Sequence, residues 1–279
     1  MPGNSALCVK AAHGNVGSRA ATSGKYLYAV IPAKAAGLPC DCVGIAGANV
    51  FSISHGRLAA VVSDIPNCRL RPERRNLAAH YAVLKHLIAQ GSTILPMVFG
   101  TITENEEVIQ RILQSHEDML VEQLKRVEGK VEMGLKISWN VPNIFEHFTN
   151  ICEELHELRD RLFRPGCEPS TDEKINLGRL FERVLNHERS LHTRNVTGTL
   201  RGRCFEIKEN KLREEREVMN LACLIGKNAQ AEFEQAVLQT ARQFDDTYTF
   251  DISGPFPPHN FVDLDLSMQD IRSERAPCS

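Results

Sequence analysis

The spacing of apolar positions predicts a small sheet in the first hundred residues. Three runs rich in β-branched, aromatic and small apolar residues predict strands at residues 26–31, 49–54 and 57–63. His55 and Gly56 separate the second run from the third, which is a signal for a hairpin with a two-residue turn. A further run at 93–99 predicts a fourth strand, and Pro96 inside it indicates an edge position or a bulge.

Two stretches of the same half carry helical periodicity. After Pro72, the apolar side chains that share one helical face are Leu77, Tyr81, Leu84 and Ile88. From about Glu104, a second helix is expected to turn inward Ile109, Ile112, Leu120, Leu124 and Val127. These elements predict an N-terminal α+β domain over residues 25–127, in which two helices cover a small sheet.

The second half opens with a strict alternation of apolar and polar residues. It runs from Val131 to Trp139 and predicts a half-buried strand, with Trp139 in the core. A helix is expected after Pro142, with an apolar stripe formed by Ile144, Phe148, Ile151, Leu155, Leu158 and Leu162. Pro165 and Gly166 interrupt this helix. Ser170 and Glu173 then form a capping-box signature for another helix, expected to reach about Leu191.

The rest of the chain completes a recognisable order of elements. Strands are predicted at 203–208, 217–225 and 247–252, with a helix marked by Phe233, Val237, Ala241 and Phe244. The run at 217–225 is apolar at both parities, so this strand is expected at the centre of the sheet, covered on both faces. The order β-α-β-β-α-β predicts a modified ferredoxin-like (split βαβ) domain over residues 128–266. The helix after Pro142 is additional to this order. Its apolar stripe is expected to pack against another surface, for which the N-terminal domain is the candidate.

Composition narrows the class of protein. Lysine plus arginine number 33 and aspartate plus glutamate 35, a net charge of −2, so nucleic acid and lipid membrane are not expected partners. Nine cysteines, an odd number, favour reduced thiols. Residues 1–24 are expected to be a disordered leader or the result of a gene start assigned too far upstream, with a transit peptide as the alternative. Residues 267–279 are expected to form a flexible tail.

Chemistry-bearing patterns are sparse. Cys40 and Cys42 form a C-x-C pair, but no second close pair of Cys or His follows at the spacing of a zinc site. The histidines join no nucleophile motif and the glycines form no phosphate loop. Glu132 and Glu206 could approach each other across the sheet. We therefore expect no catalytic residue, no metal and no cofactor, and hence no enzyme.

Two segments are candidates for contact with another protein. The first is the charged group Arg71, Glu73, Arg74 and Arg75 beside His80, where guanidinium groups can hold carboxylates. Its alternative is an ion-paired, solvated helix start tied to Asp64 and Glu73. The second is the proline-rich loop GPFPPHNF, whose candidates are Phe256, Pro257, Pro258 and His259. Its alternative is a loop packed on its own sheet.

Long segments of the chain, taken in order, carry a family resemblance. They are YLYAVIPA (26–33), GRLAAVVSD (56–64), RPERRNLAAHYAVL (71–84), ILPMVFG (94–100), GKVEMGLKISWNVPNIFEHF (129–148), EVMNLACLIGK (217–227) and FDISGPFPPHNFVDL (250–264). Through these segments, residues 25–266 resemble the GvpF/GvpL family of gas vesicle proteins. Within this family, the resemblance is greatest to the GvpF branch. The resemblance implies an α+β first domain and a ferredoxin-like second one.

The resemblance also implies a function and its partners. It implies a minor structural or assembly component of the gas vesicle, within the cytoplasm, with the major shell protein and other gas vesicle accessory proteins as partners. The role would be to keep the hydrophobic shell subunit from aggregating, or to line the gas-facing inner surface. Two alternatives stay open. One is a regulatory protein that binds a small ligand on a ferredoxin-like sheet. The other is an enzyme that uses Arg74 or His80.

Overall fold

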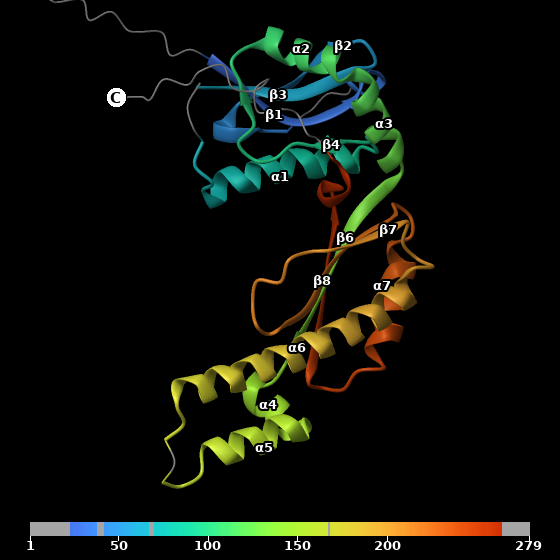
Figure 1. Ribbon diagram of the computed structural model, residues 1–279. Coiled ribbons are helices and arrows are strands. Elements are labelled where there is room, and N and C mark those ends of the chain that lie inside the picture. The colour runs from blue at the N-terminus through green and yellow to red at the C-terminus, as the bar shows by residue number, and fades with distance from the viewer. Residues whose placement is uncertain (1–22, 38–41, 67–69, 167, 264–279) are drawn as a thin grey trace, which may run out of the picture.

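The computed structural model describes residues 23–37, 42–66, 70–166 and 168–263, and shows an α+β fold with two antiparallel sheets (Figure 1). The first sheet has the order β2-β3-β1-β4, and β5 also pairs with β1. Its strands are β1 (Ser23–Pro32), β2 (Val50–His55), β3 (Leu58–Pro66), β4 (Leu95–Pro96) and β5 (Ile102–Thr103). Strand β1 begins two residues before the expected Lys25, so Ser23 and Gly24 belong to the fold and not to a leader.

The predicted hairpin is present, with its turn shifted by one residue. His55 pairs with Leu58, so the two loop residues are Gly56 and Arg57 rather than His55 and Gly56. Gly56 has φ 54°, the left-handed conformation that a primed hairpin turn requires at its first central position. The predicted strand at 93–99 shrinks to β4, where Pro96 pairs only with Ala29 of β1 at the edge of the sheet.

Three helices cover the first sheet where two were expected: α1 (Arg74–Ala89), α2 (Glu106–Ser115) and α3 (Glu117–Val127). The inward residues expected for the second helix are all buried. The prediction of a single helix is wrong, because His116, with φ −116° and ψ 16°, separates α2 from α3. The inward face of α1 is also rotated. His80 and Val83 are buried with Leu84 and Leu87, whereas Tyr81 is exposed.

The second sheet confirms the ferredoxin-like order. Its strands are β6 (Lys130–Trp139), β7 (Glu206–Glu209), β8 (Glu217–Gly226) and β9 (Tyr248–Phe256), arranged β7-β8-β6-β9. The first and third strands of this unit, β6 and β8, form the middle pair. Strand β8 is buried almost throughout, as its continuous apolar run predicts.

The helices of this half are α4 (Ile144–Ile151), α5 (Glu153–Leu162), α6 (Thr171–Leu200) and α7 (Gln230–Ala241). The capping box is confirmed, because the backbone N–H of Glu173 donates to Ser170 Oγ and that of Ser170 to the Glu173 carboxylate. Helix α6 continues to Leu200, beyond the expected Leu191. The single helix expected after Pro142 is broken at Cys152, whose φ −110° and ψ 109° are extended.

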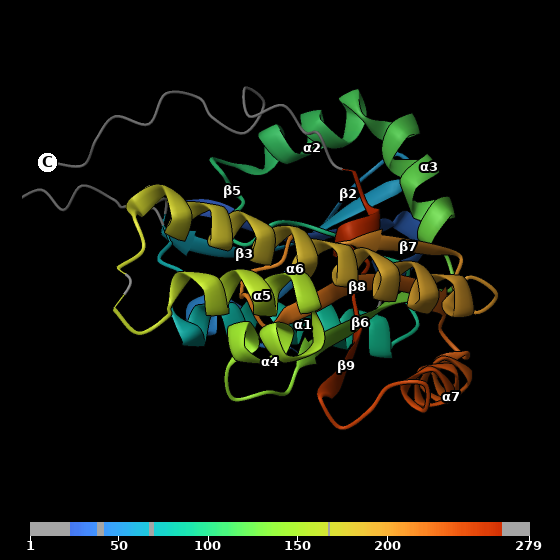
Figure 2. The ribbon, with the colours of Figure 1, turned by 60° about the horizontal axis from the view of Figure 1, so that its bottom comes forward.

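The extra helices do not cover the first sheet, which corrects that expectation. Phe148 of α4 packs edge-on against Trp139 at 5.1 Å between ring centroids, and Phe145 lies 5.3 Å from Phe181 of α6. Their apolar stripe, apart from Ile151, is therefore packed against α6 and the end of β6, within the core of the second sheet. In Figure 1, α4, α5 and the first half of α6 project away from the first sheet, and Figure 2 shows α5 running beside α6.

The two sheets share one of their cores. Ala222 and Leu224 of β8 and Phe261 of the short 3-10 helix η3 (His259–Phe261) pack with residues of the first sheet, α2 and α3. The boundary at residues 127 and 128 separates the two sheets in the chain, and as a domain boundary it stays a prediction. Two further 3-10 turns, η1 (Ala33–Ala35) and η2 (Ile45–Gly47), lie in the first half.

Cysteine chemistry departs from the expectation at one position. Cys152, Cys204 and Cys223 are free thiols, as expected, but Cys42 is disulfide-bonded. An odd count of cysteines does not decide whether two sulfur atoms lie within bonding distance. Residues 1–22 of the expected leader, Cys40 and the tail expected at 267–279 fall outside the described residues. Among those that are described, no helix is long and apolar enough to cross a membrane.

Candidate protein-contact surfaces

The arginine-rich start of α1 lies on the surface. Arg71, Glu73, Arg74 and Arg75 are all exposed. Arg75 Nε lies 2.9 Å from Glu73 Oε2, between two largely exposed side chains, so this pair adds little stability. Glu73 occupies the N-cap position, but its carboxylate accepts no capping hydrogen bond from the backbone. The alternative reading expected ion pairs with both Glu73 and Asp64. The Glu73 pair is present, and Asp64 lies 2.6 Å from Lys25 Nζ. The arginines themselves are exposed and accessible to a partner's carboxylates.

His80 is not part of that surface. It is 1% exposed, and its Nδ1 lies 2.9 Å from the hydroxyl of Tyr26. The ring stacks on Tyr28, whose hydroxyl lies 2.9 Å from Ser63 Oγ and accepts a hydrogen bond from the Ile45 backbone. Burial lowers the pKa of His80 to about 4 and raises the pKa of Tyr26. This histidine therefore belongs to a polar network inside the core.

The proline-rich loop packs largely inside the chain. Pro257 and Pro258 are buried, and Phe256 and His259 are half-buried. The ring of His259 lies 6.1 Å from that of Tyr81 on α1, so this segment runs along the first sheet's helix. The alternative, a loop packed on its own sheet, agrees with the burial of Pro257 and Pro258 and with the bond from Asn260 to Glu132 of β6. The contact proposal for a partner accordingly depends on the arginines and not on these rings.

A polar clamp holds this segment against the second sheet. Asn260 donates from its backbone N–H to Glu132 Oε2 at 2.9 Å and from Nδ2 to Glu132 Oε1 at 2.6 Å. Lys208 Nζ donates to the Asn260 carbonyl at 2.8 Å. Burial raises the pKa of Glu132, while the hydrogen bonds from Asn260 oppose that rise. A buried carboxylate with both oxygens hydrogen-bonded serves as a structural anchor.

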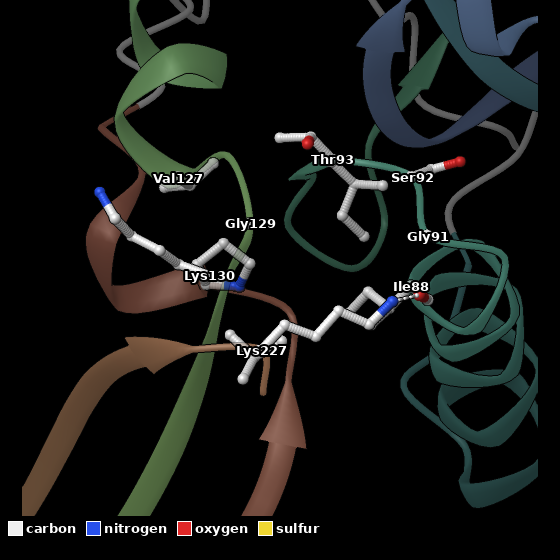
Figure 3. A pocket seen from close by; sticks show the side chains of 11 residues that line it. Ile88, Gly91, Ser92, Thr93, Val127, Gly129, Lys130 and Lys227 are labelled. Carbon is white, nitrogen blue, oxygen red and sulfur yellow. Dashed lines mark hydrogen bonds between the residues drawn. The ribbon is translucent and has the colours of Figure 1, made fainter. Parts of the chain in front are cut away.

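The crevice between the two sheets is too small for an organic ligand. Figure 3 shows it between α1, the end of α3 and the turn that follows β8, with Lys227 reaching across it. Lys227 Nζ donates to the carbonyl oxygen of Ile88, the residue before the last of α1, at 2.8 Å. The cavity volume is about 30 Å³, which is room for a water molecule. The crevice therefore marks a contact between α1 and the turn after β8, and it has no room for an organic ligand.

A larger groove opens on the first half of the chain. Its volume is about 480 Å³, and it lies between the end of β1, the end of α1 and helix α3. Apolar side chains form part of its wall, among them Val121 and Leu124, and Lys34, Arg57 and Lys125 also line it. Arg57 is already paired with Glu117 and Asp118. The groove has the size of a small-ligand site, but it is open to solvent and shows no converging set of buried polar groups.

The candidate catalytic constellations do not assemble. Glu132 and Glu206 flank Leu224 from opposite sides of β8, and each has its own partner. Glu206 pairs with Arg126 at 2.7 Å, and Glu132 binds Asn260. Arg74 lies on the surface while His80 is buried, so these two do not form a joint site. Within the described ranges, no cluster of three or more His, Cys, Asp or Glu side chains is placed to hold a metal ion.

Helices α4 and α5 and the first half of α6, here called the helical projection, expose large apolar side chains to solvent. The apolar period of the sequence does not indicate this exposure. Ile151 is 63% exposed, Phe163 56% and Ile175 45%. Ile151 ends α4, Phe163 follows α5, and Ile175 lies in the first part of α6. The sequence placed Ile151 on a buried stripe because it assumed a continuous helix through Cys152. The extended conformation of Cys152, which ends α4, is what turns Ile151 toward solvent.

Comparison with known proteins agrees with this architecture. The family model described as gas vesicle synthesis protein GvpL/GvpF matches residues 24–263. Gas vesicle protein F of Haloferax mediterranei is 26% identical over 88% of this chain and 97% of its own length. Gas vesicle protein F1 of Halobacterium salinarum is 25% identical over 91% and 100%. The crystal structure of the gas vesicle protein GvpF from Anabaena sp. PCC7120 superposes with a TM-score of 0.75 at 25% identity, over 87% of this chain and 99% of that one. The chain belongs to the GvpL/GvpF family of gas vesicle synthesis proteins.

Proposed function

We propose that this protein supports gas vesicle formation by binding the apolar shell subunit, without catalysing a reaction. The family match over nearly the whole described chain supports a role connected with gas vesicles. The large exposed apolar side chains on the helical projection support the mode of binding. Hiding apolar surface from water contributes about 25 cal/mol per Å², before the costs of association are subtracted. A shell subunit held in this way would stay soluble until assembly.

The binding surface we propose is the projection formed by α4, α5 and the first half of α6. It departs from the simplest ferredoxin-like order, and it projects away from the first sheet (Figure 1). Its own core contains Phe148 and Phe181, whose ring centroids lie 6.2 Å apart, and does not include the exposed Ile151 and Phe163. Ile151 and Phe163 are consequently not needed for that core and are available to a partner. Bound there, the protein would lie against the shell, and we place it on the gas-facing inner side.

A double substitution tests this surface. Ile151→Ser with Phe163→Ser is expected to weaken binding of the shell subunit by roughly 20-fold to 400-fold. Full burial of one apolar side chain is worth about 1.5–3 kcal/mol, and these two have 63% and 56% of their surface left to cover. The measurements are the soluble fraction of co-produced shell subunit and the vesicle yield. Leu238→Ser is the matched control, because Leu238 is 61% exposed on α7, outside the projection. An equal effect of the control and the double variant would contradict the proposal, as would no effect of either. Protease resistance of this protein in intact vesicles, lost on collapse, tests its inner location.

The arginines at the start of α1 form a second proposed contact, with carboxylates of another gas vesicle protein. Arg74→Glu with Arg75→Glu is expected to slow association several-fold and to reverse its salt dependence, since rim charges act chiefly on the rate of encounter. Surface plasmon resonance against each gas vesicle protein at two ionic strengths measures both. Arg111→Glu with Arg242→Glu, two exposed arginines on and after other helices, gives the same change of net charge. Equal rates for the two double variants would show that only net charge matters.

A further inference from the structure

Strand β9 is an open edge of the second sheet. It pairs with β6 on one side, and no strand among the described residues pairs with its other side. Helix α7 follows β8 and packs on the helix-covered face of the sheet, where Phe244 lies 5.1 Å from Phe250. The row formed by Tyr248, Phe250 and Ile252 is only partly buried there. An edge strand of this length presents unpaired backbone groups to any second strand.

Hydrogen bonds at the end of β6 determine which backbone groups of β9 point outward. The N–H of Asn140 donates to the Thr247 carbonyl at 2.6 Å, whereas that of Trp139 donates away from β9, to Arg216. Residue pairs in an antiparallel ladder alternate between bonded and non-bonded. In the observed register, Thr249 and Asp251 are therefore bonded to β6. The N–H and C=O groups of Phe250 and Ile252, and the Tyr248 carbonyl, point to the open side.

We propose that a second copy of this chain pairs with β9, antiparallel, about a two-fold axis at Phe250. In that register Phe250 faces Phe250 of the other copy, and Tyr248 faces Ile252. The two Phe250 residues exchange both of their hydrogen bonds, and each Ile252 N–H donates to the Tyr248 carbonyl opposite. The Tyr248 N–H is already donated to Asp245 in the preceding turn. The same edge serves both copies, as a two-fold interface requires.

Side chains and charge select this register over its neighbours. On the open face of the sheet, Asp251 comes opposite Thr249 of the other copy, which is uncharged. Moving the axis to Asp251 would place the two aspartates directly opposite each other, and like charges in that position are destabilising. Moving it to Thr249 would leave the Ile252 backbone without its partner. On the other face, an aromatic pair forms at Phe250 and an aromatic–β-branched pair at Tyr248 and Ile252, both favourable.

The length of the paired segment limits its strength. Gly254 has φ 121°, and the register shifts at this point, so the regular edge ends before Pro255, which has no N–H to donate. A segment this short gives a weak and reversible dimer. Its formation needs no other gas vesicle protein, so it is independent of the proposed binding of the shell subunit.

Sedimentation equilibrium of the full chain, over a concentration series, tests the proposal with a charge pair. Thr249→Lys places a cation opposite Asp251 at both symmetric positions and is expected to tighten the dimer about fivefold. Thr249→Asp places like charges there and should weaken it by a similar factor. Thr199→Lys and Thr199→Asp, at an exposed position of α6, are the matched controls for net charge. Circular dichroism checks that each variant folds.

The outcomes separate the alternatives. Opposite shifts for the two Thr249 variants, absent from the Thr199 pair, support the Phe250 register. A dimer that Thr249→Lys weakens, or that both pairs change equally, would mean another register or another surface and would overturn the proposal. A monomer in both wild type and Thr249→Lys up to the solubility limit would overturn it as well. So would an edge taken instead by a strand of the shell subunit while the chain alone stays monomeric.

Discussion

Replacing Phe261 with alanine is expected to lower the free energy of unfolding by about 3–5 kcal/mol, the usual cost of emptying a buried phenylalanine site. Phe261 is 0% exposed and packs against residues of the first sheet, α2 and α3, although it follows the last strand of the second sheet. Strand β8 contributes Leu224 to the same core. Elements of both sheets surround the ring, so the cavity cannot close by moving one of them alone.

Urea unfolding measures this loss. Trp139, the only tryptophan, lies in the core of the second sheet, so its fluorescence reports that half, whereas far-ultraviolet circular dichroism reports the whole chain. In wild type the two signals should change together, because the core that contains Phe261 belongs to both sheets. In Phe261→Ala they should still change together, at a lower urea concentration, so that one free energy of unfolding describes each protein. Leu238→Ala, at an exposed position, is the control and should stay within about 0.5 kcal/mol of wild type. A loss below about 1 kcal/mol for Phe261→Ala would contradict the shared core.

The contacts around Phe261 explain why the junction is both apolar and polar. Asn260, next to it, is bonded to Glu132 on β6 and to Lys208 on β7. Burial of the apolar ring stabilises the folded state but does not depend on direction. The hydrogen bonds of Asn260 are directional and determine the path of the chain just before the ring. Lys227 adds a direct link from the turn after β8 to α1. The two sheets are thereby positioned relative to each other by side chains from the last part of the described chain.

The elements that the sequence predicted well are those determined by local pattern. The alternation from Val131 to Trp139 and the continuous apolar run of β8 are readable because each depends on two faces of one strand. The capping box at Ser170 is likewise complete within four residues. From these elements the ferredoxin-like order follows, including its middle pair of strands.

The failures come from tertiary contacts. The breaks at His116 and Cys152 carry no proline or glycine, and a helical apolar period runs through both. The predicted face of α1 is wrong because the apolar period does not include His80. This buried histidine is bonded to the hydroxyl of Tyr26, more than fifty positions earlier in the chain. The packing of Pro257 and Pro258 depends in the same way on residues far away in the chain. The exposed arginines at α1 were the part of the candidate surface that local composition could indicate.

The buried environment of His80 makes the stability of this fold sensitive to acid. Its ring contacts Tyr26, Tyr28 and Tyr81, and a proton on nearby His259 would oppose a second positive charge on His80. Burial lowers the pKa of His80 from 6.5 to about 4. As pH falls, the unfolded chain takes up this proton first, which favours unfolding. The stability associated with neutral His80 is therefore fully present above about pH 6.5, declines from there to about pH 4, and is constant below that.

Comparing wild type with His80→Asn isolates this contribution. Asparagine keeps an amide group near the position of Nδ1 but does not titrate. A pKa difference of about 2.5 corresponds to about 3 kcal/mol, so the wild type should lose that much more than the variant between pH 6.5 and pH 4. The subtraction is needed because burial also lowers the pKa of His259, which acts in the same direction, and raises the pKa of Glu132, which acts in the opposite one. Urea unfolding at intervals across that range gives both curves. Parallel curves would mean that His80 is protonated in the folded protein, and that the buried network around Tyr26 accommodates the charge.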